Sequence, residues 1–283
     1  MVRGVRSVTD VRFCVLGSGS RGNAFWLSAG GRELLIDQGF SARELERRLR
    51  EIDSAPERLQ AVILTHTHAD HLNRGFLRVM LKHRIALLCH SQHARQLGRD
   101  ARFARLMREG LVRPYPGRGR FSVLERFEFA PLRLPHDCPP TFGFIVEIER
   151  DSHPVRLAYL ADLGHVPEGV LEQVSRSGVD VLLLEFNHDE EMERRSRRSA
   201  ALIERVLGPQ GHLSNRQACE ALVRMLGAGE RPAHSLVQLH ISEDCNERRL
   251  AYHSARQTLE LLGTATRVFS SCQDQPGRVH RIS

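Results

Sequence analysis

Short apolar runs alternate with amphipathic segments along most of the chain, which is the pattern of an α/β protein. Strands are indicated where short apolar or β-branched runs lie between turns rich in glycine or proline. The predicted strands are residues 12–16, 24–28, 33–37, 61–64, 85–89, 121–124, 126–129, 142–148, 156–160, 179–186, 235–239, 266–269 and 279–282.

Helices are predicted where apolar residues recur every three or four positions. The first has a capping-box spacing, in which Ser41 precedes Glu44 by three residues, and Leu45 and Leu49 share one face. The others are residues 74–83, 91–109, 168–176, 189–207, 214–226 and 247–262. Because strands and helices alternate in both halves, we expect two mixed β-sheets packed together and flanked by helices, a four-layer αββα sandwich.

The composition is that of a globular protein. With 283 residues, 41% of them hydrophobic, and a mean hydropathy of -0.33, we expect residues 1–283 to form a single domain. No stretch approaches ~18 consecutive apolar residues, and residues 1–13 lack the apolar run of a signal peptide, so we expect no membrane association. The six cysteines include no Cys-x-x-Cys pair, which argues against a disulfide framework or a zinc ribbon and fits a reducing cytoplasm.

The net charge of +7 suits an anionic partner such as nucleic acid. Lys82 is the only lysine, so arginine carries nearly all of the positive charge. A skewed coding composition would produce the same excess without functional selection. Charge alone therefore leaves the partner open.

A glycine-rich loop, Gly17–Gly22, satisfies the G-x-G-x-x-G pattern of dinucleotide-binding proteins. That site requires a helix after the last glycine, whereas residues 24–28 and 33–37 indicate two strands. The loop is therefore predicted to be either a tight turn or an anion contact at the mouth of a site. In the second case the contacts would come from Ser18, Ser20 and Asn23.

The strongest chemical signal is the sequence THTHADH at residues 65–71, directly after an apolar strand. Three imidazoles and a carboxylate so close together would be costly in a core, because each needs polar partners. Imidazole nitrogen and carboxylate oxygen are ligands of Zn²⁺, Mn²⁺ and Fe²⁺. A loop at a strand end can direct alternate side chains toward two ions, so the segment predicts a metal site.

This H-x-H-x-D-H motif resembles that of the metallo-β-lactamase superfamily. In order along the chain, further segments resemble the YycJ/WalJ branch of that superfamily, whose relatives include the RNase J and RNase Z nucleases. They are GSGSRGNAFWL, LLIDQGFS, ILTHTHADHLNRG, LPHDCPPTFGF, YLADLGHV, LLLEFNHDEEM, GHLSN and LHISEDCN.

The resemblance implies an αββα fold with two divalent transition-metal ions between the sheets, zinc first of all, with manganese or iron as alternatives. It implies a first ion held by His66, His68 and His136. A second ion would be held by Asp70, His71 and His240, and Asp162 would bridge the two.

Two such cations lower the pKa of a bridging water from 15.7 toward ~7 and so produce a hydroxide nucleophile. Asp70 would ligate and orient that hydroxide as a catalytic residue. Asp37 is a candidate acceptor for the N–H of a ligand imidazole, or alternatively a turn-capping residue.

A second catalytic candidate, His212, lies just before a capping box formed by Ser214 and Gln217. Helix starts attract anions, so residues 211–215, with Ser214 and Asn215, are either a phosphate contact or a simple cap. His188 is a candidate substrate contact or an ordinary loop residue. The run of arginines at positions 194, 195, 197 and 198 is either a solvated helix face or a phosphate-tracking surface.

Two functions remain after these observations. The first is a metal-dependent phosphodiesterase acting on nucleic acid, similar to a DNA exonuclease; the second is a hydrolase of a thioester, lactone or cyclic phosphodiester. RNase J and its cleavage-factor relatives insert a β-CASP domain before the last metal histidine. Only 78 positions separate Asp162 from His240, and predicted helices and a strand fill them, so no such insertion is expected. A metal-binding regulator would require a lost ligand, and none is lost. The sequence leaves open DNA or RNA, the polarity of cleavage and the oligomeric state.

Overall fold

The computed structural model describes residues 10–151, 153–227 and 232–282. Residues 1–9, which belong to the segment predicted to carry no signal peptide, lie outside the described residues. Within the described ranges, no helix combines the length and the apolar character needed to span a bilayer.

The described residues form two seven-stranded sheets. The strand order of the first is β14-β1-β2-β3-β4-β5-β6, and that of the second is β13-β12-β11-β10-β9-β8-β7. The first sheet comprises β1 (Val11–Gly17), β2 (Ala24–Ala29), β3 (Arg32–Ile36), β4 (Leu59–Ile63), β5 (Ala86–His90), β6 (Val112–Tyr115) and β14 (His280–Ile282). The second comprises β7 (Phe121–Val123), β8 (Phe127–Leu134), β9 (Thr141–Ile148), β10 (Val155–Leu160), β11 (Val181–Glu185), β12 (Ser235–Leu239) and β13 (Arg267–Ser270).

Both sheets are mixed, as the sequence predicts. In the second sheet β10, β11, β12 and β13 are parallel, while β9 is antiparallel to both β10 and β8. It follows that β8 runs in the same direction as β10. The carboxyl ends of β8, β10, β11 and β12 therefore meet at one edge of the sheet, where side chains of the following loops can converge.

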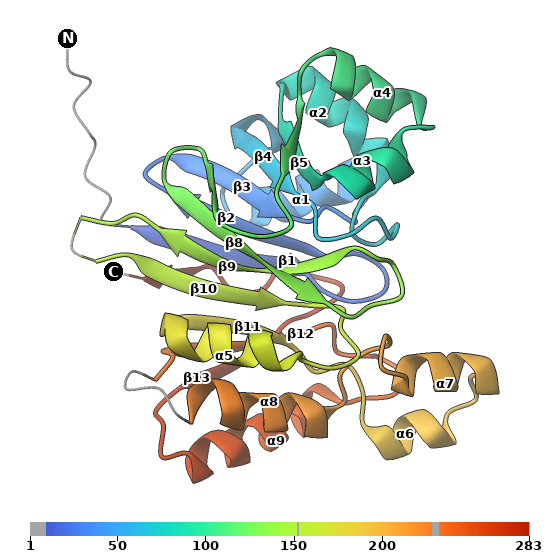
Figure 1. Cartoon of the computed structure of the whole chain (residues 1–283), viewed down its shortest axis with the longest axis vertical. Coiled ribbons are helices and arrows are strands. Elements are labelled where there is room, and N and C mark those ends of the chain that lie inside the picture. Colours follow the sequence, from blue (N-terminus) through green and yellow to red (C-terminus); the bar gives the residue numbers. More distant parts are fainter. Residues whose placement is uncertain (1–9, 152, 228–231, 283) are drawn as a thin grey trace.

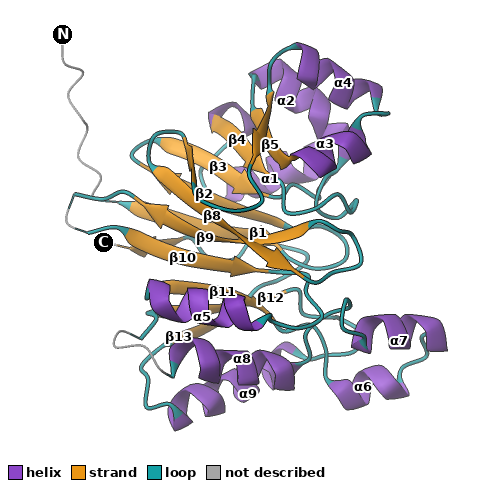
Figure 2. Ribbon diagram, in the orientation of Figure 1, coloured by secondary structure: helices purple, strands orange, loops and turns teal. Residues whose placement is uncertain are grey.

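Helices cover the outer face of each sheet, which gives the predicted four-layer sandwich (Figures 1 and 2). One apolar core, with Phe13, Phe25, Phe144 and Tyr159, lies between the sheets. A second packs the first sheet against its helices, and a third packs the other sheet against α5, α8 and α9. The helices are α1 (Ala42–Glu51), η1 (Pro56–Arg58), η2 (Arg74–Phe76), α2 (Leu77–His83), α3 (Ser91–Leu97), α4 (Ala101–Arg108), α5 (Glu168–Ser177), α6 (Glu190–Arg195), α7 (Ala200–Leu207), α8 (Asn215–Leu226) and α9 (Arg248–Leu261).

Two predicted long helices are wrong in extent, because each is interrupted by a capping residue. The stretch 91–109 forms α3 and α4, and Asp100 begins the second by accepting hydrogen bonds from the backbone N–H groups of Arg102 and Phe103. The stretch 189–207 forms α6 and α7, and Ser199 caps the latter. Such side chains offer the backbone an alternative to continuing a helix. The edge strand β6 was not predicted as a separate strand.

Candidate metal centre

The predicted ligands lie at one edge of the sandwich. The histidine motif, residues 65–71, is on the loop that follows β4. In the second sheet His136, Asp162 and His240 follow the ends of β8, β10 and β12. Because these three strands run in the same direction, their following residues reach the same edge and face the motif.

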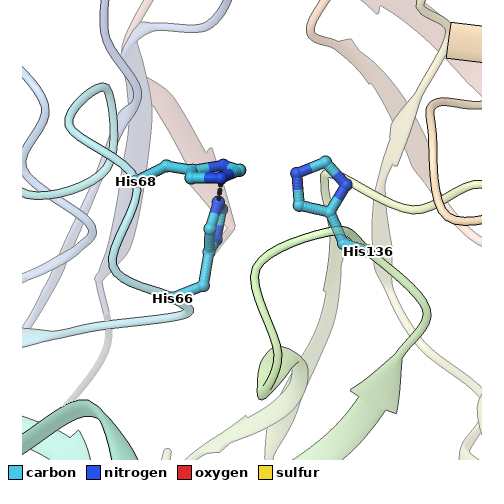
Figure 3. A group of neighbouring side chains, drawn as sticks. All are labelled: His66, His68 and His136. Carbon is cyan, nitrogen blue, oxygen red and sulfur yellow. Dashed lines mark hydrogen bonds between the residues drawn. The ribbon is translucent and has the colours of Figure 1, made fainter. Parts of the chain in front are cut away.

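A first cluster consists of His66, His68 and His136, whose ring nitrogens lie within 4.8 Å of one another. The rings converge from two loops, and Nε2 of His66 is 3.1 Å from Nδ1 of His68 (Figure 3). Nδ1 of His66 is 2.9 Å from Oγ1 of Thr65, and Nδ1 of His136 is 3.1 Å from the carbonyl oxygen of Gly211. Each of these two rings is thus fixed through Nδ1, which leaves Nε2 for an ion.

Asp162 is the centre of a second cluster. Its Oδ2 is 2.7 Å from Nε2 of His71, and its Oδ1 is 2.8 Å from Nδ1 of His240. Asp162, His240 and Asp37 have positive φ angles of 58°, 51° and 61°. A left-handed backbone costs a non-glycine residue about 1–2 kcal/mol, and such positions are concentrated at functional sites.

Both clusters fit a divalent transition metal, since their donors are imidazole nitrogens and carboxylate oxygens. Oδ2 of Asp162 and Nδ1 of His240 are buried and lie within 2.8 Å of neighbouring polar atoms. Even so, neither atom makes a hydrogen bond of proper geometry with any described residue. A bound cation would satisfy both atoms, which the hydrogen bonds among the described residues do not.

Two histidines of the first cluster are suited to act as neutral ligands, whereas a hydrogen bond with Cys138 raises the pKa of the third, His68. Burial lowers the pKa of His66 well below its usual value, and burial also lowers the pKa of His136. Both rings are therefore uncharged at pH 7, and their lone pairs are available to a metal.

The second cluster is held together by opposite charges. Burial acts to lower the pKa of His71 and of His240, but nearby carboxylates, Asp162 foremost, outweigh it and raise both pKa values. Burial acts to raise the pKa of Asp162, and His240 and His71 outweigh it in turn. A divalent cation would compete with the imidazole protons for the same carboxylate, so metal binding here releases protons.

Asp37 holds two residues of the histidine motif in place through its carboxylate. Its Oδ2 lies 2.7 Å from Nδ1 of His71 and accepts a hydrogen bond of 2.7 Å from Oγ1 of Thr65. Its Oδ1 accepts a 2.8 Å hydrogen bond from the backbone N–H of Thr65. The carboxylate therefore holds the His71 ring with Nε2 toward Asp162, which is the geometry that the first of the two roles expected for Asp37 requires.

Asp70 lies at the rim of the second cluster, with Oδ2 3.8 Å from Nε2 of His71. Its backbone is held against Gly39, where a Cβ atom would come within 1.7 Å of the Asp70 carbonyl oxygen. The glycine of the segment LLIDQGFS is thus required for the motif loop to close. A Cβ on Gly211 would similarly come within 2.2 Å of the carbonyl oxygens of Arg205 and Val206.

Glu185, at the end of β11, is a site residue that the sequence analysis missed. It is fully buried, and its Oε1 lies 2.7 Å from Nδ1 of His212 and 3.2 Å from Nδ1 of His240. Burial acts to raise its pKa, but His212 outweighs burial and holds that pKa at about 2. A carboxylate ending the apolar run Val-Leu-Leu-Leu was the available signal, because a buried charge needs a partner.

The two clusters open into a cleft of about 700 Å³. His68, Asp70 and His212 line it, together with Ser20 from the glycine-rich loop. Three arginines also line the cleft, namely Arg21, Arg198 and Arg205.

Other candidate substrate contacts do not line the cleft. Ser18 is buried, and its Oγ accepts a 2.9 Å hydrogen bond from the backbone N–H of His240. Nδ2 of Asn23 lies 2.9 Å from Nε2 of His71, so Asn23 supports a predicted ligand. His188, Ser214 and Asn215 are buried, and Ser214 caps α8 together with Gln217. The structure thus places these five side chains in the buried surroundings of the site and not on the surface of the cleft.

The arginine run is divided between two environments. Arg194 and Arg195 pair with Glu190 and Glu191 one helical turn earlier, as on a solvated helix face. Arg198 instead turns to the cleft, where it pairs with Glu193 and Asp244.

A family model described as the beta-lactamase superfamily domain matches residues 32–241. The chain belongs to the metallo-β-lactamase superfamily. Exodeoxyribonuclease WalJ of Streptococcus pneumoniae is 27% identical over 242 residues, which cover 85% of both chains. Exodeoxyribonuclease YycJ of Bacillus anthracis is 24% identical over 262 residues, which cover 89% of this chain and 90% of that protein.

Solved structures of this superfamily share the fold. A diphosphatase of the PhnP family matches with a TM-score of 0.62 and 17% identity, covering 97% of this chain and 99% of that one. Zinc-bound PqqB from Methylobacterium extorquens matches with a TM-score of 0.66 and 16% identity, covering 94% and 99%. The predicted αββα fold and the predicted family are therefore confirmed. The prediction that the protein is a hydrolytic enzyme is confirmed as well.

Proposed function

We propose that the protein is a metal-dependent phosphodiesterase that cleaves nucleic acid, similar to a DNA exonuclease. The observation that carries the proposal is the pair of adjoining ligand clusters at the base of a cleft that also holds three arginines. The names of the two curated relatives support the substrate class.

His66, His68 and His136 would hold one ion. Asp70, His71 and His240 would hold a second, with Asp162 between the two. The donors suit zinc first, and manganese or iron as well. When bound, the ions supply Lewis acidity and lower the pKa of a coordinated water toward ~7.

The residues of the chain would divide the remaining work. Asp70, which lines the cleft, orients the attacking water through its carboxylate. His212 also lines the cleft, and Glu185 holds its Nδ1, so the opposite ring nitrogen is available to give a proton to the leaving oxygen. Glu185 itself is fully buried and does not line the cleft, so it would act as a positioning residue.

Arg205 and Arg198 would bind the non-bridging oxygens of the phosphate. Nε of Arg205 contacts Oδ2 of Asp137, whose Oδ1 is 3.2 Å from Nε2 of His136. The guanidinium is thus anchored beside the first cluster. Arginine is suited to this role because its planar fork presents paired donors to phosphate oxygens.

We also propose that residues 1–283 act as one metallo-β-lactamase-fold domain without a β-CASP insertion. The described part of the interval from Asp162 to His240 forms α5, β11, α6, α7, α8 and the strand β12. No second domain lies within that described part. A polymer would then enter an open cleft beside α7.

The decisive experiment offers the purified protein, loaded with Mn²⁺ or Zn²⁺, end-labelled single- and double-stranded DNA and RNA. Thioester, lactone and bis-p-nitrophenyl phosphate substrates are assayed in parallel. We expect cleavage of polynucleotide that chelator and Asp70→Asn both abolish, while Asp53→Asn, an exposed aspartate on another loop, has no effect. Cleavage of a thioester or lactone with no polynucleotide cleavage under either metal would contradict the proposal in favour of a small-molecule hydrolase.

A further inference from the structure

The positive charge of the chain is concentrated in one segment. Residues 74–118 contain eleven of the 41 basic side chains and only two of the 34 acidic ones, Asp100 and Glu109. The rest of the chain therefore has 30 basic and 32 acidic side chains, close to balance. A uniform compositional bias toward arginine would not remove acidic residues from one segment alone.

This segment forms η2, α2, α3 and α4, of which α2, α3 and α4 lie together on the outer side of the first sheet (Figure 1), and it also contributes β5 and the edge strand β6 of that sheet. We call this surface the basic face. Asp100 pairs with Arg74 and Arg102, and Glu109 pairs with Arg84, so both acidic residues are already engaged. Exposed side chains that form no ion pair with any described carboxylate include Arg78, Lys82, Arg95, Arg99, Arg105 and Arg108.

Four of the cations surround one groove between α2 and α4. It has a volume of about 490 Å³ and is lined by Arg78, Lys82, Arg102 and Arg105, with Leu81 and Ala101 between them and no carboxylate. Arg102 is paired with Asp100, but Arg78, Lys82 and Arg105 form no ion pair with any described carboxylate. Like charges held this close repel one another, so the arrangement favours a bound polyanion.

The basic face is continuous with the candidate metal centre through α3. Gln96 on this helix accepts a 2.9 Å hydrogen bond from Thr67, which lies between His66 and His68. The Nε2 of Gln96 donates a 3.0 Å hydrogen bond to the carbonyl oxygen of Pro139, on the loop after His136. Arg95 precedes Gln96 on α3, and Arg99 lies on the short connection from α3 to α4, and both are exposed.

We propose that the basic face binds the phosphate backbone of a polynucleotide substrate outside the cleft and guides the strand to the metal centre. This inference rests on the proposed function, which it extends by a second contact region. Exposed arginines suit repeated backbone phosphates, and their contacts release counterions whatever the base sequence.

A polynucleotide fits this face better than an anionic membrane does. Surfaces that bind bilayers combine cations with exposed large apolar side chains that enter the interface. Within residues 74–118, all of them described, Met107 is the one exposed large hydrophobic side chain, while Phe76, Phe103 and Leu106 are buried.

The test is a triple variant, Arg78→Gln, Lys82→Gln and Arg105→Gln, made in the full chain. The matched control, Arg176→Gln, Arg224→Gln and Arg249→Gln, removes the same charge from exposed positions on α5, α8 and α9. Binding of fluorescent single-stranded DNA with nuclease-resistant phosphorothioate linkages to the metal-loaded protein is measured by anisotropy, with one oligonucleotide of about 8 nucleotides and one of about 40. Thermal melting checks that both variants fold.

We expect wild type and control to bind the long strand more tightly than the short one. Each phosphate contact contributes about 0.7 to the log–log salt slope for single strands, or about fivefold at 0.1 M salt relative to 1 M. Loss of three contacts should therefore weaken binding of the long strand by about 100-fold and lower the slope by about 2. Binding of the short strand should change much less, because it fits within the cleft.

Equal binding of the long strand by wild type, triple variant and control would overturn the proposal. Loss of binding to phosphatidylglycerol vesicles by the triple variant, with DNA binding unchanged, would overturn it in favour of a membrane. Because binding is measured without turnover, the two proposals can fail separately. If the triple variant loses DNA binding but wild type cleaves no polynucleotide, the basic face is supported and the proposed function is not.

Discussion

Replacing Glu185 with glutamine should lower turnover while leaving the metal in place. Glutamine has nearly the same shape but carries no charge, so the 2.7 Å contact between Oε1 and Nδ1 of His212 loses its charge assistance. The amide can also present its NH₂ group to that nitrogen. The His212 ring then loses both its preferred tautomer and its orientation toward the cleft.

The expected magnitude follows from that single contact. A hydrogen bond to a charged group contributes about 1.5–3 kcal/mol. At 1.36 kcal/mol for each factor of ten, its loss corresponds to a decrease in kcat of about 10- to 150-fold. Because the role proposed for Glu185 in turnover is to hold His212, the double variant Glu185→Gln/His212→Asn should be little worse than His212→Asn alone.

The assay compares two leaving groups. Cleavage of a dinucleotide expels a basic alkoxide that needs a proton, whereas cleavage of bis-p-nitrophenyl phosphate expels a phenolate that does not. We expect the decrease in kcat for the dinucleotide and a much smaller one for the nitrophenyl ester. Glu33→Gln is the matched control, since Glu33 is also buried on a strand and pairs with Arg58 away from the site; it should change stability and not kcat.

An equal decrease for both substrates, together with loss of metal, would refute this reasoning. Glu185 lies among Asp162, His212 and His240 in a group close enough to hold an ion. Such a result would identify it as a metal ligand rather than a residue that positions His212.

Three further predictions concern the metal and the loop that carries its predicted ligands. Gly39→Ala should destabilise the fold by about 1–3 kcal/mol in thermal melting and weaken metal retention, because its Cβ would overlap the Asp70 carbonyl, whereas Gly169→Ala, with open space around it in α5, should not. Chelation should shift one melting transition of the whole chain to a lower temperature, because the ligands come from both sheets. Removing metal that was present at 1,000 times its Kd should lower the free energy of unfolding by about 4 kcal/mol, and two independent transitions would contradict this. Elemental analysis should find close to two transition-metal ions per chain, and an Asp70→Ala/His71→Ala variant that kept both would disprove the second ion's assignment.

Much of this protein could be predicted from local sequence. The periodicity of apolar residues placed most strands and helices, because that pattern depends on which face of each element is buried. His66, His68 and His71 lie on one short loop, so their spacing alone indicated a metal site. Their role as ligands remains a prediction, as do those of His136, Asp162 and His240.

The tertiary structure decided which polar side chains face the cleft and which support it. Ser18, Asn23 and Ser214 are of the residue types that commonly contact substrates. In the structure they are buried and interact with neighbouring protein groups instead. Glu185 becomes part of the site only because the fold brings the end of β11 beside His212, which lies 27 positions further along the chain. Local spacing cannot encode such contacts, because they depend on how the sheets align residues far apart in the chain.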